Sequence, residues 1–547
     1  MAQTQTYKAV YFPPEGARDV QRLTIEFAPD DLVGSNHSKK MIMGELSLAP
    51  KTPRCDVFFF PFVHITFAEV CAARSIAVRA LSALPSPSTC STRPKDLYLH
   101  EGTLAGRPFG RCGPPTAIYD SRLAGLSDAL RSLETSVPVP TPSKLAWAIS
   151  FIRLALDFYA TEDQREKELR KLIDEVFPGA DWQRPSTIFR AEAIWDGQIF
   201  ESKQERGNGG DPEIQCIGDY GKIVSDFSTP MGRFRDHSCL PTVLISQAGT
   251  QLDVCTAVFT DVVLVDHLYT MNFHDGFAIE RQVLSLARLI TTLAIAFNDL
   301  QTYYRILRAP TKPMSSMIAS SVHLPMPVPN CAPFAPLTTT LNVRFLYKLS
   351  RITGIAVNPT DAKDCELNSR HAVFVALGGG LANIPEQPVI IKFTEKYNIV
   401  AHQKLAVLGL APTLYHHSRI RGGWHMVVME HISGIIANYW PELSKEPLLP
   451  HCIYQDVKAA IDALHKGNIV FGDLRSPNHS HMPGEKKTCA GRSRERGRRR
   501  GRQKRLEIPR HPRRFRLGLR GGRWSLPGDN LFFGELGAGC RTVWTNG

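Results

Sequence analysis

The chain has 547 residues, of which 43% are apolar and 21% charged, and it contains 39 prolines. This composition excludes a wholly disordered chain and predicts two to four globular domains separated by irregular segments. The net charge of +13 comes from one segment, because residues 486–523 hold seventeen Lys/Arg against two Glu and the rest of the chain is slightly acidic. A basic surface spread over the whole protein is therefore excluded.

Residues 1–135 show little periodicity and carry the Pro/Ser/Thr cluster "LPSPSTCSTRP", so we expect a poorly ordered N-terminal region. The first residues lack the basic and apolar stretches of a secretory signal. The twelve cysteines are scattered without CxxC pairs or Cys/His clusters typical of zinc sites, which indicates reduced thiols in an intracellular protein, cytoplasmic or nuclear. The apolar segment "VLSLARLITTLAIAF" is too short, and interrupted by Arg288, to predict a membrane span.

Residues 136–310 are predicted to form an α+β module. The stretch "TPSKLAWAISFIRLALDFYATEDQREKELRKLIDEVF" has helical spacing, with Thr141 or Ser143 as the cap. The pair Asp196-Gly197 predicts a tight hairpin. Strands follow in "PTVLISQAG" and "LDVCTAVFTDVVLVDHL", and the module closes with the long helix "GFAIERQVLSLARLITTLAIAFNDLQTYYRIL".

One motif in this module suggests a second function. In "FESKQE", Glu201 and Lys203 lie on one strand face, and Asp211 and Gln215 follow. Metal-dependent nucleases of the restriction type use a carboxylate and a lysine at this spacing, around a metal-bound water. A nuclease-like module is thus an alternative, although E-x-K also occurs commonly at solvated strand edges.

A proline-rich linker is predicted at residues 311–340, followed by a second domain over residues 341–480. Its elements are predicted in the order strand "NVRFLYKLSRI", strand "HAVFVALGG", strand "QPVIIKFTE", helix "EKYNIVAHQKLAVLGLAP" and strand "WHMVVMEHISG". The segment "YQDVKAAIDALHKGN" then predicts a further helix.

This domain carries candidates for phosphoryl transfer, which needs a cation on the phosphates, a carboxylate for the acceptor and oxygen ligands for Mg²⁺. Lys392 closes the strand "VIIK", after the turn "LGGG" with Gly378, Gly379 and Gly380. Glu430 ends a strand at the point where a linker between two lobes would begin. Asp473 and Asn478 have the D-x-x-x-x-N spacing in "FGDLRSPN".

These residues give the chain a resemblance to the protein kinase superfamily, whose catalytic loop reads H-R-D-L-x-x-x-N. With "VIIKFTEKYNIVAHQKLAVLGLAPTLY", "WHMVVMEHISG", "NIVFGDLRSPN" and "FESKQERGNGGDPEIQC", it most resembles the fungal-type protein kinase-like family. The resemblance implies a two-lobe fold that binds ATP and Mg²⁺ and transfers the γ-phosphate to a Ser/Thr hydroxyl of a protein substrate. Lys392 would hold the α/β-phosphates, Asp473 would orient the acceptor, and Asn478 would bind Mg²⁺.

The chain departs from the kinase pattern in two places. Where the helix after Lys392 should offer a glutamate, the sequence has Val400, and Glu395 substitutes only if the helix starts early. After Asn478 no in-frame D-F-G or D-F-D follows an apolar strand, so one Mg²⁺ loses its main ligand. We therefore expect an α+β protein in which a kinase-like domain with a truncated C-lobe follows a separate α+β module, with catalysis absent or very weak.

The arginine-rich segment at residues 481–547 is predicted to be a disordered tail read out of frame. "LEIPRHPRRFRLG" can be encoded so that a neighbouring frame reads W-K-F-R-V-I-L-V-D-F-D-W-A, which supplies the missing metal-binding motif. A frameshift or altered splice site would produce this tail. Nucleic-acid binding through its arginines is the alternative, and a scaffold role is a third.

Overall fold

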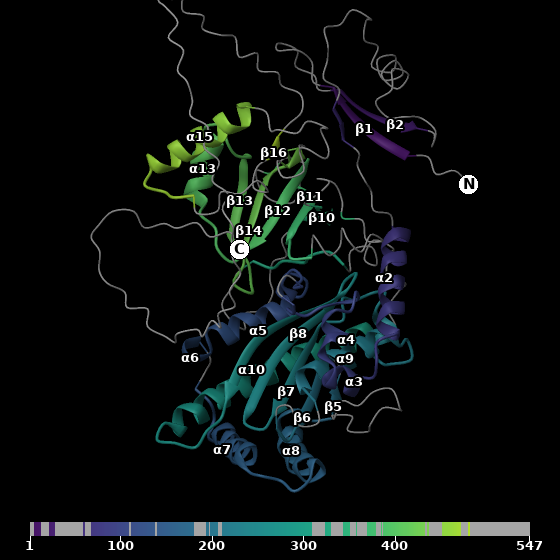
Figure 1. The fold of residues 1–547 in the computed structure, drawn as a ribbon, viewed down its shortest axis with the longest axis vertical. Coiled ribbons are helices and arrows are strands. Elements are labelled where there is room, and N and C mark those ends of the chain that lie inside the picture. The colour runs from purple at the N-terminus through teal and green to yellow at the C-terminus, as the bar shows by residue number, and fades with distance from the viewer. Residues whose placement is uncertain are drawn as a thin grey trace, which may run out of the picture.

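The structure is a computed structural model that describes residues 5–11, 21–27, 58–60, 67–108, 111–136, 139–179, 193–195, 197–205, 210–308, 323–329, 343–350, 357, 369–378, 384, 387–432, 435–436, 451–471 and 480–481. Helices and mixed sheets make it an α+β protein. A larger unit is built on a six-stranded sheet, and a smaller one on a five-stranded sheet (Figure 1).

The N-terminal region is more structured than the sequence suggests. A small sheet of order β2-β1-β3 comprises β1 (Gln5–Tyr11), β2 (Gln21–Phe27) and β3 (Phe58–Phe60). Then come α2 (Phe67–Ser82), α3 (Pro87–Thr92), α4 (Pro94–Tyr98), β4 (Thr103–Leu104), the 3₁₀ helix η1 (Thr116–Ile118), α5 (Ser121–Arg131) and α6 (Leu133–Ser136). The prediction of poor order was therefore wrong for residues 67–108 and 111–135.

Local chemistry explains these helices. In the Pro/Ser/Thr cluster two of the three prolines, Pro87 and Pro94, occupy the first turn of a short helix, where the missing N–H costs nothing, and Ser86 Oγ accepts from Thr89 N at 3.3 Å. Asp120 caps α5, because its Oδ1 accepts from Arg122 N at 2.9 Å. Residues that indicated poor order thus start helices.

The six-stranded sheet has the order β4-β9-β8-β7-β6-β5, with β5 (Ala193–Trp195), β6 (Gln198–Lys203), β7 (Thr242–Ala248), β8 (Gln251–Phe259) and β9 (Val263–Asn272). The predicted hairpin is confirmed, because β5 and β6 pair antiparallel around Gly197, whose φ is +85°. β6 and β7 pair in parallel, and α9 (Pro212–Ser225) connects them. The segment "LDVCTAVFTDVVLVDHL" supplies two strands, β8 and β9, joined at Thr260–Val262.

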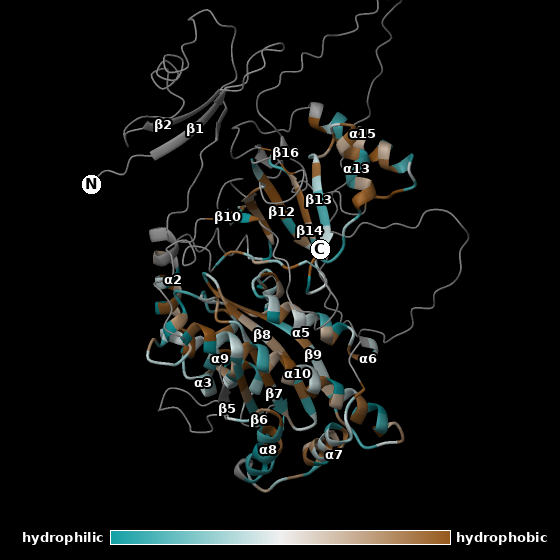
Figure 2. Cartoon of the chain, turned by 180° about the vertical axis from the view of Figure 1, so that it is seen from behind, coloured by the Kyte–Doolittle hydropathy of each residue, from teal (hydrophilic) through white to brown (hydrophobic). Residues whose placement is uncertain are grey.

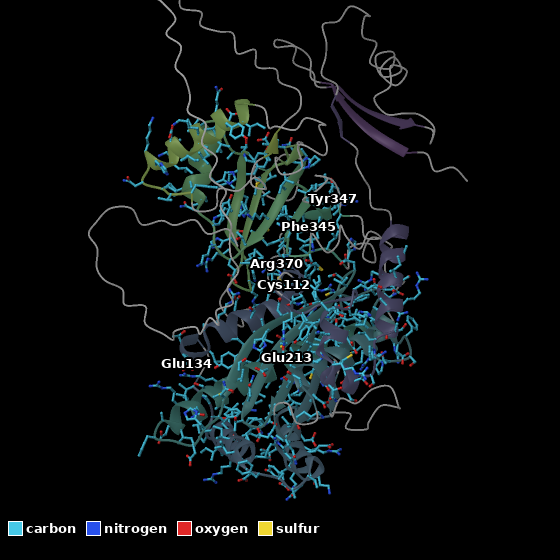
Figure 3. The ribbon with its side chains drawn as sticks, in the orientation of Figure 1. Cys112, Glu134, Glu213, Phe345, Tyr347 and Arg370 are labelled. Atoms are coloured by element: carbon cyan, nitrogen blue, oxygen red, sulfur yellow. The ribbon has the colours of Figure 1, made fainter. Side chains whose placement is uncertain are left out.

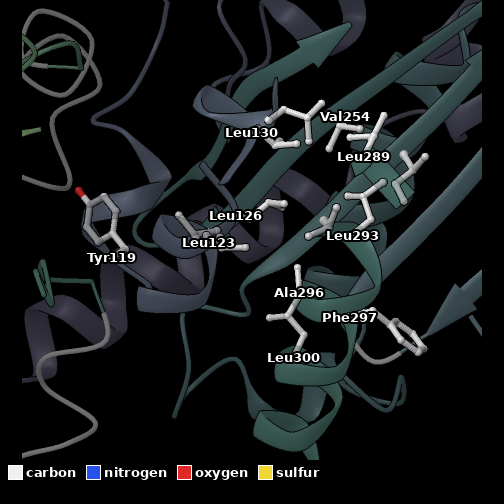
Figure 4. Close-up of a cluster of buried hydrophobic side chains, with 14 of the residues drawn as sticks. Tyr119, Leu123, Leu126, Leu130, Val254, Leu289, Leu293, Ala296, Phe297 and Leu300 are labelled. Carbon is white, nitrogen blue, oxygen red and sulfur yellow. The ribbon is translucent and has the colours of Figure 1, made fainter. Parts of the chain in front are cut away.

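Helices cover both faces of this sheet. On one face α9 packs on β6 and β7, and α2, α3 and α4 pack on α9. On the other lie α5, α7 (Pro142–Leu156), α8 (Glu162–Val176) and α10 (Ile279–Arg308). The predicted cap Thr141 is confirmed, since its Oγ1 accepts from Lys144 N at 3.4 Å. Figure 4 shows the core formed by α5, α10 and Val254 of β8.

Among the described residues, helix α10 alone is long and apolar enough to cross a membrane by length and composition. It has 30 residues, so it is longer than its most apolar segment. Its apolar side is buried against the sheet and α5, through Leu286, Leu289, Leu293, Phe297 and Leu300. In the hydropathy colouring both α10 and the neighbouring strands carry many brown residues (Figure 2). This packing accounts for its composition.

The five-stranded sheet has the order β10-β11-β12-β14-β13, and all its pairs are antiparallel. Its strands are β10 (Arg344–Lys348), β11 (Val373–Leu377), β12 (Pro388–Thr394), β13 (Leu414–Arg419) and β14 (His425–Glu430). The predicted helices are confirmed as α13 (Ile399–Val407) and α15 (His451–His465). The pair β15 (Ile435–Ile436) and β16 (Ser480–His481) follows, and β13 was not predicted.

The two sides of this sheet have different neighbours. Phe345, Phe374 and Ile391 point toward the larger unit and join its core. A bulge between Phe345 and Tyr347 turns Tyr347 to the opposite side, where it packs with Val375. Figure 3 labels both residues of β10. We call this opposite side, which carries Ile390 and Lys392, the Lys392 side.

The module before the proline-rich segment is not separate from the smaller unit, because one buried cluster contains residues of both. Residues 323–329, within the predicted linker, join the units: Met326 N donates to Ile118 O at 2.8 Å, and Arg421 N donates to Val328 O at 2.8 Å. Arg370 Nε also donates to Cys112 Sγ at 3.1 Å, and Figure 3 shows the two residues together between the sheets. The apolar face of the smaller sheet requires such a cover.

Candidate functional site

Lys392 occupies the middle of a sheet rather than a strand end. β12 continues to Thr394, as the strand predicted in "QPVIIKFTE" allows, so Lys392 does not close it. Lys392 pairs with Val373 on one side and with Val427 on the other, which places its partly buried side chain on a largely apolar surface. A cation in such surroundings is suited to hold a phosphate.

The helix that follows Lys392 offers no acid. α13 begins after Asn398, whose Oδ1 accepts from Ala401 N at 3.1 Å, and its sequence is IVAHQKLAV. Glu395 is exposed and precedes the helix, so it cannot substitute in the way that an early start would allow. Val400 is 62% exposed and points away from the sheet. Within α13 the kinase lysine–glutamate pair therefore has no counterpart.

His402 takes the inward position of α13 instead. Its Nε2 lies 2.8 Å from the carbonyl oxygen of Pro412 and therefore donates to it, while the Tyr397 hydroxyl bonds to Nδ1. Burial lowers the pKa of His402, and the positive charge of Lys392 lowers it further, although the bond to Pro412 opposes both. Lys392 is thus accompanied by a neutral imidazole.

Aromatic rings extend this arrangement along the Lys392 side. Tyr397 stacks on His417 with ring centroids 5.9 Å apart, and His417 stacks on His425 at 5.0 Å. Burial lowers the pKa of both His417 and His425. Because His417 pairs with Val427, which also pairs with Lys392, this stack flanks the lysine.

Glu430 ends β14 as predicted, and its side chain binds the residue that precedes β13. Its Oε2 accepts from Thr413 N at 3.0 Å and from Thr413 Oγ1 at 2.8 Å, which fastens the start of β13. It pairs with Val389, three positions along β12 from Lys392. The chain leaves the sheet just after it.

The "LGGG" turn lies at the other end of the β11–β12 hairpin. Gly378 N donates to Gln387 O at 3.1 Å, next to the pair Leu377–Pro388. Lys392 pairs with Val373, four residues further along β12, or about 13 Å away. Lys392 lies instead beside the ends of the β10–β11 connection, because its partner Val373 begins β11 and Lys348, the last residue of β10, pairs with Phe374. Gly379 and Gly380 lie outside the described residues.

Asp473 and Asn478 also lie outside the described residues, as does the arginine-rich segment. The last described residue before Asp473 is Phe471, which packs on a small cluster of Ala401, Leu464 and Ile469 between α13 and α15. The structure therefore brings the segment leading to Asp473 against the helix that carries His402.

In the larger unit, the E-x-K motif is buried rather than solvated. Glu201 Oε1 lies 3.1 Å from Lys203 Nζ, and the side chain of Glu201 is 1% exposed. Ser246 of β7 and Asp253 of β8 share a row with Glu201 across the sheet. The Ser246 hydroxyl is buried and has no hydrogen-bond partner among the described residues. A polar patch therefore lies beneath the N-terminal part of α9.

The other two residues of that motif have different surroundings. Asp211 caps α9, because its Oδ1 accepts from Glu213 N at 3.0 Å. Gln215 is buried in the first turns of the same helix. Asp211 thus stabilises the helix end, which is the common use of an aspartate at that position.

Sequence reasoning missed a third group, since it found no cysteine–histidine cluster. Cys255 of β8, His267 of β9 and Glu213 of α9 converge with their ligand atoms within 4.8 Å of one another. Figure 3 labels Glu213 in the larger unit, and all three residues belong to the face that α9 covers. Alternation on adjacent strands places Cys255 beside His267, but only the register of β8 and β9 reveals it.

Comparisons with known proteins give no match: no family profile, curated protein or solved structure is significantly similar to this chain.

Proposed function

We propose that residues 343–471 form the nucleotide-binding part of a protein kinase-like phosphotransferase. In protein kinases the lysine that holds the α/β-phosphates lies on the third strand, and the next helix packs beside it. Lys392 lies on the third strand of its sheet along the chain, and α13 follows on the Lys392 side. This single observation carries the proposal.

The proposal assigns ATP and Mg²⁺ as ligands and a Ser/Thr hydroxyl of a protein as the acceptor. Lys392 fits a phosphate group, because it is a partly buried cation next to the neutral His402. Glu430 lies where the linker to a second lobe would begin. Asp473 would orient the acceptor hydroxyl and Asn478 would hold Mg²⁺, which the resemblance alone supports.

The absence of an acid from α13 predicts weak transfer or none, so nucleotide binding is the property to measure. Binding of Mg·ATP to the full chain is compared for the wild type, Lys392→Met and Lys396→Met, which removes an exposed lysine four residues away. Loss of charge-assisted bonds worth about 1.5–3 kcal/mol predicts at least tenfold weaker binding for Lys392→Met alone. A wild type that does not bind, or equal effects of both variants, contradicts the proposal.

The proposal for the tail is independent of nucleotide binding. A frameshift or altered splice site after Asn478 predicts that transcripts across codons 475–547 include a form that encodes D-F-D-W. Bases that forbid this motif in the neighbouring frames contradict it. Salt-dependent RNA binding that shows sequence preference and is lost with residues 481–547 would favour the nucleic-acid alternative instead.

A second candidate function is metal-dependent cleavage of nucleic acid by the larger unit. The ion pair of Lys203 with the buried Glu201, which shares its row with Asp253, favours this function over a solvated strand edge. Cleavage of DNA with Mg²⁺ or Mn²⁺ is expected to disappear in Glu201→Gln and to persist in Glu168→Gln, which changes an exposed glutamate of α8. Equal activity of the two variants excludes this function.

A further inference from the structure

Three potential ligand atoms from three elements form a nearly equilateral triangle on the α9-covered face of the larger sheet. Cys255 Sγ lies 3.5 Å from His267 Nδ1 and 3.6 Å from Glu213 Oε1. His267 Nδ1 lies 3.6 Å from Glu213 Oε1. The residues are 42, 12 and 54 positions apart in pairs, so only the fold brings them together.

These separations match the edges of a metal tetrahedron. Zinc lies about 2.3 Å from sulfur and about 2.0–2.2 Å from nitrogen or oxygen, so its tetrahedral ligands are about 3.3–3.6 Å apart. A thiol that simply donates one hydrogen bond needs only one short contact. Here all three edges have the length that a shared ion requires.

A second observation fixes the orientation of the histidine. Thr270 Oγ1 donates to Asp253 Oδ1 at 2.6 Å, because a carboxylate can only accept. Thr270 Oγ1 must then accept from His267 Nε2, which lies 2.7 Å away. In the neutral imidazole the proton of His267 is therefore on Nε2, and the lone pair of Nδ1 faces Cys255 and Glu213. Such outer hydrogen bonds orient metal-bound histidines in general.

We propose that Glu213, Cys255 and His267 bind a divalent transition metal of the zinc class. A thiolate and an imidazole favour zinc over magnesium or calcium, which prefer oxygen ligands. Binding releases the thiol proton of Cys255 to solvent and leaves the thiolate on the metal. The site does not rest on nucleotide binding or on nucleic-acid cleavage.

The arrangement leaves the fourth coordination position for water. The side chain of His267 is 44% exposed, while Cys255 is 1% exposed, so the triangle is buried on the sulfur side and open on the imidazole side. Three protein ligands and one water are the pattern of sites at which zinc activates the water. The site therefore combines a buried sulfur ligand, Cys255, with a fourth coordination position that solvent can reach.

The test uses Co²⁺ as the probe with the purified full chain. We expect one equivalent to bind with a thiolate-to-cobalt charge-transfer band and the visible bands of a tetrahedral ion. Cys255→Ser should lose the charge-transfer band, and His267→Ala should bind at least tenfold more weakly. Cys112→Ser, which removes a more accessible thiol, should retain both properties.

A variant of Thr270, which is not a ligand, tests the orientation of His267 separately. Thr270→Val removes the hydrogen-bond acceptor that holds the proton of His267 on Nε2, but it removes no metal ligand. This variant is expected to weaken Co²⁺ binding about 10–100-fold. If Cys255→Ser does not fold, the more exposed His267→Ala decides the matter. Absence of a charge-transfer band in the wild type, or equal spectra for Cys255→Ser and Cys112→Ser, overturns the proposal.

Discussion

The ammonium of Lys203 lies 3.1 Å from the carboxylate of Glu201, and this ion pair is buried within one strand of the larger sheet. Ion pairs shielded from water are costly to break, because the remaining charge loses its compensation and cannot be hydrated. The pair is therefore a sensitive point of the fold, whatever the chemistry at this face.

Replacing Lys203 with Met should lower the free energy of unfolding by about 3–5 kcal/mol, because the charge of Glu201 loses the ammonium. The double variant Glu201→Gln with Lys203→Met should be less destabilised than the single one. Urea denaturation measures both. Equal or additive losses would mean that the two side chains are not coupled in the folded protein.

Arg165 of α8 is a second buried cation with a defined task. Its Nη1 donates to Lys203 O at 2.8 Å and its Nη2 to Gly249 O at 2.8 Å, so it joins the end of β6 to the β7–β8 turn. Arg165→Lys keeps the charge but loses the planar fork, and should cost about 1–3 kcal/mol. Arg170→Lys, on the exposed side of α8, is the matched control. A smaller loss for Arg165→Lys than for Arg170→Lys would contradict this account.

The common core of the two units predicts a single unfolding transition. Phe374 packs against Phe345 and Phe393 with ring centroids 5.8 and 6.0 Å away, in the cluster that also contains residues of α5 and α10. Phe374→Ala should cost about 3–5 kcal/mol and lower the whole calorimetric transition. Two resolved transitions in the variant, with the larger unit unaffected, would show that the units unfold independently.

Acid should destabilise the contact between the units through His323. This side chain borders a cavity of about 170 Å³ together with Asp261 and Phe374. Burial lowers the pKa of His323 from 6.5 to about 4, an effect that the nearby Asp261 opposes and Arg74 strengthens. The folded protein therefore keeps this imidazole neutral over a pH range in which the unfolded chain protonates it.

The sign and size of the change in stability with pH follow from this difference in the pKa of His323 between the folded and unfolded protein. Above pH 6.5 the group has no effect, and from pH 6.5 down to about 4 the unfolded chain binds the extra proton, so stability falls. The loss by pH 5 is about 2 kcal/mol. His323→Phe should remove this part of the slope when the free energy of unfolding is measured at pH 7 and pH 5. A slope identical to that of the wild type would refute the assignment.

Sequence patterns predicted most elements of the smaller unit, because β11, β12 and β14 are apolar runs of typical strand length. β13 was not predicted because "LYHHSR" shows no alternation of apolar and polar residues. In the structure this strand is half-buried along most of its length. The helical stretch after Thr141 proved to be two helices, because the chain turns between Asp157 and Thr161. Spacing along the chain cannot reveal such a turn when both flanks are periodic.

The candidate sites likewise contain some features that local sequence predicts and others that depend on the fold. The place of Lys392 on its strand follows from local sequence, whereas its companion His402 depends on the rotation of α13 about its axis. The convergence of Cys255, His267 and Glu213 depends on strand register, including an irregularity between Val254 and Cys255. Local patterns carry no information on such long-range alignment.

The apolar cover on one side of the five-stranded sheet has a mechanical consequence. That sheet is attached to the larger unit through Phe374 in the common core and through the bridge between Ile420 and Pro329. The larger unit therefore supports the sheet on the side opposite to Lys392. Helices α13 and α15 pack on each other through a small cluster of their own. Helix α13 is also fastened to this sheet, because His402 donates to the carbonyl of Pro412 just before β13, so Lys392 and the imidazole beside it both take their positions from one sheet.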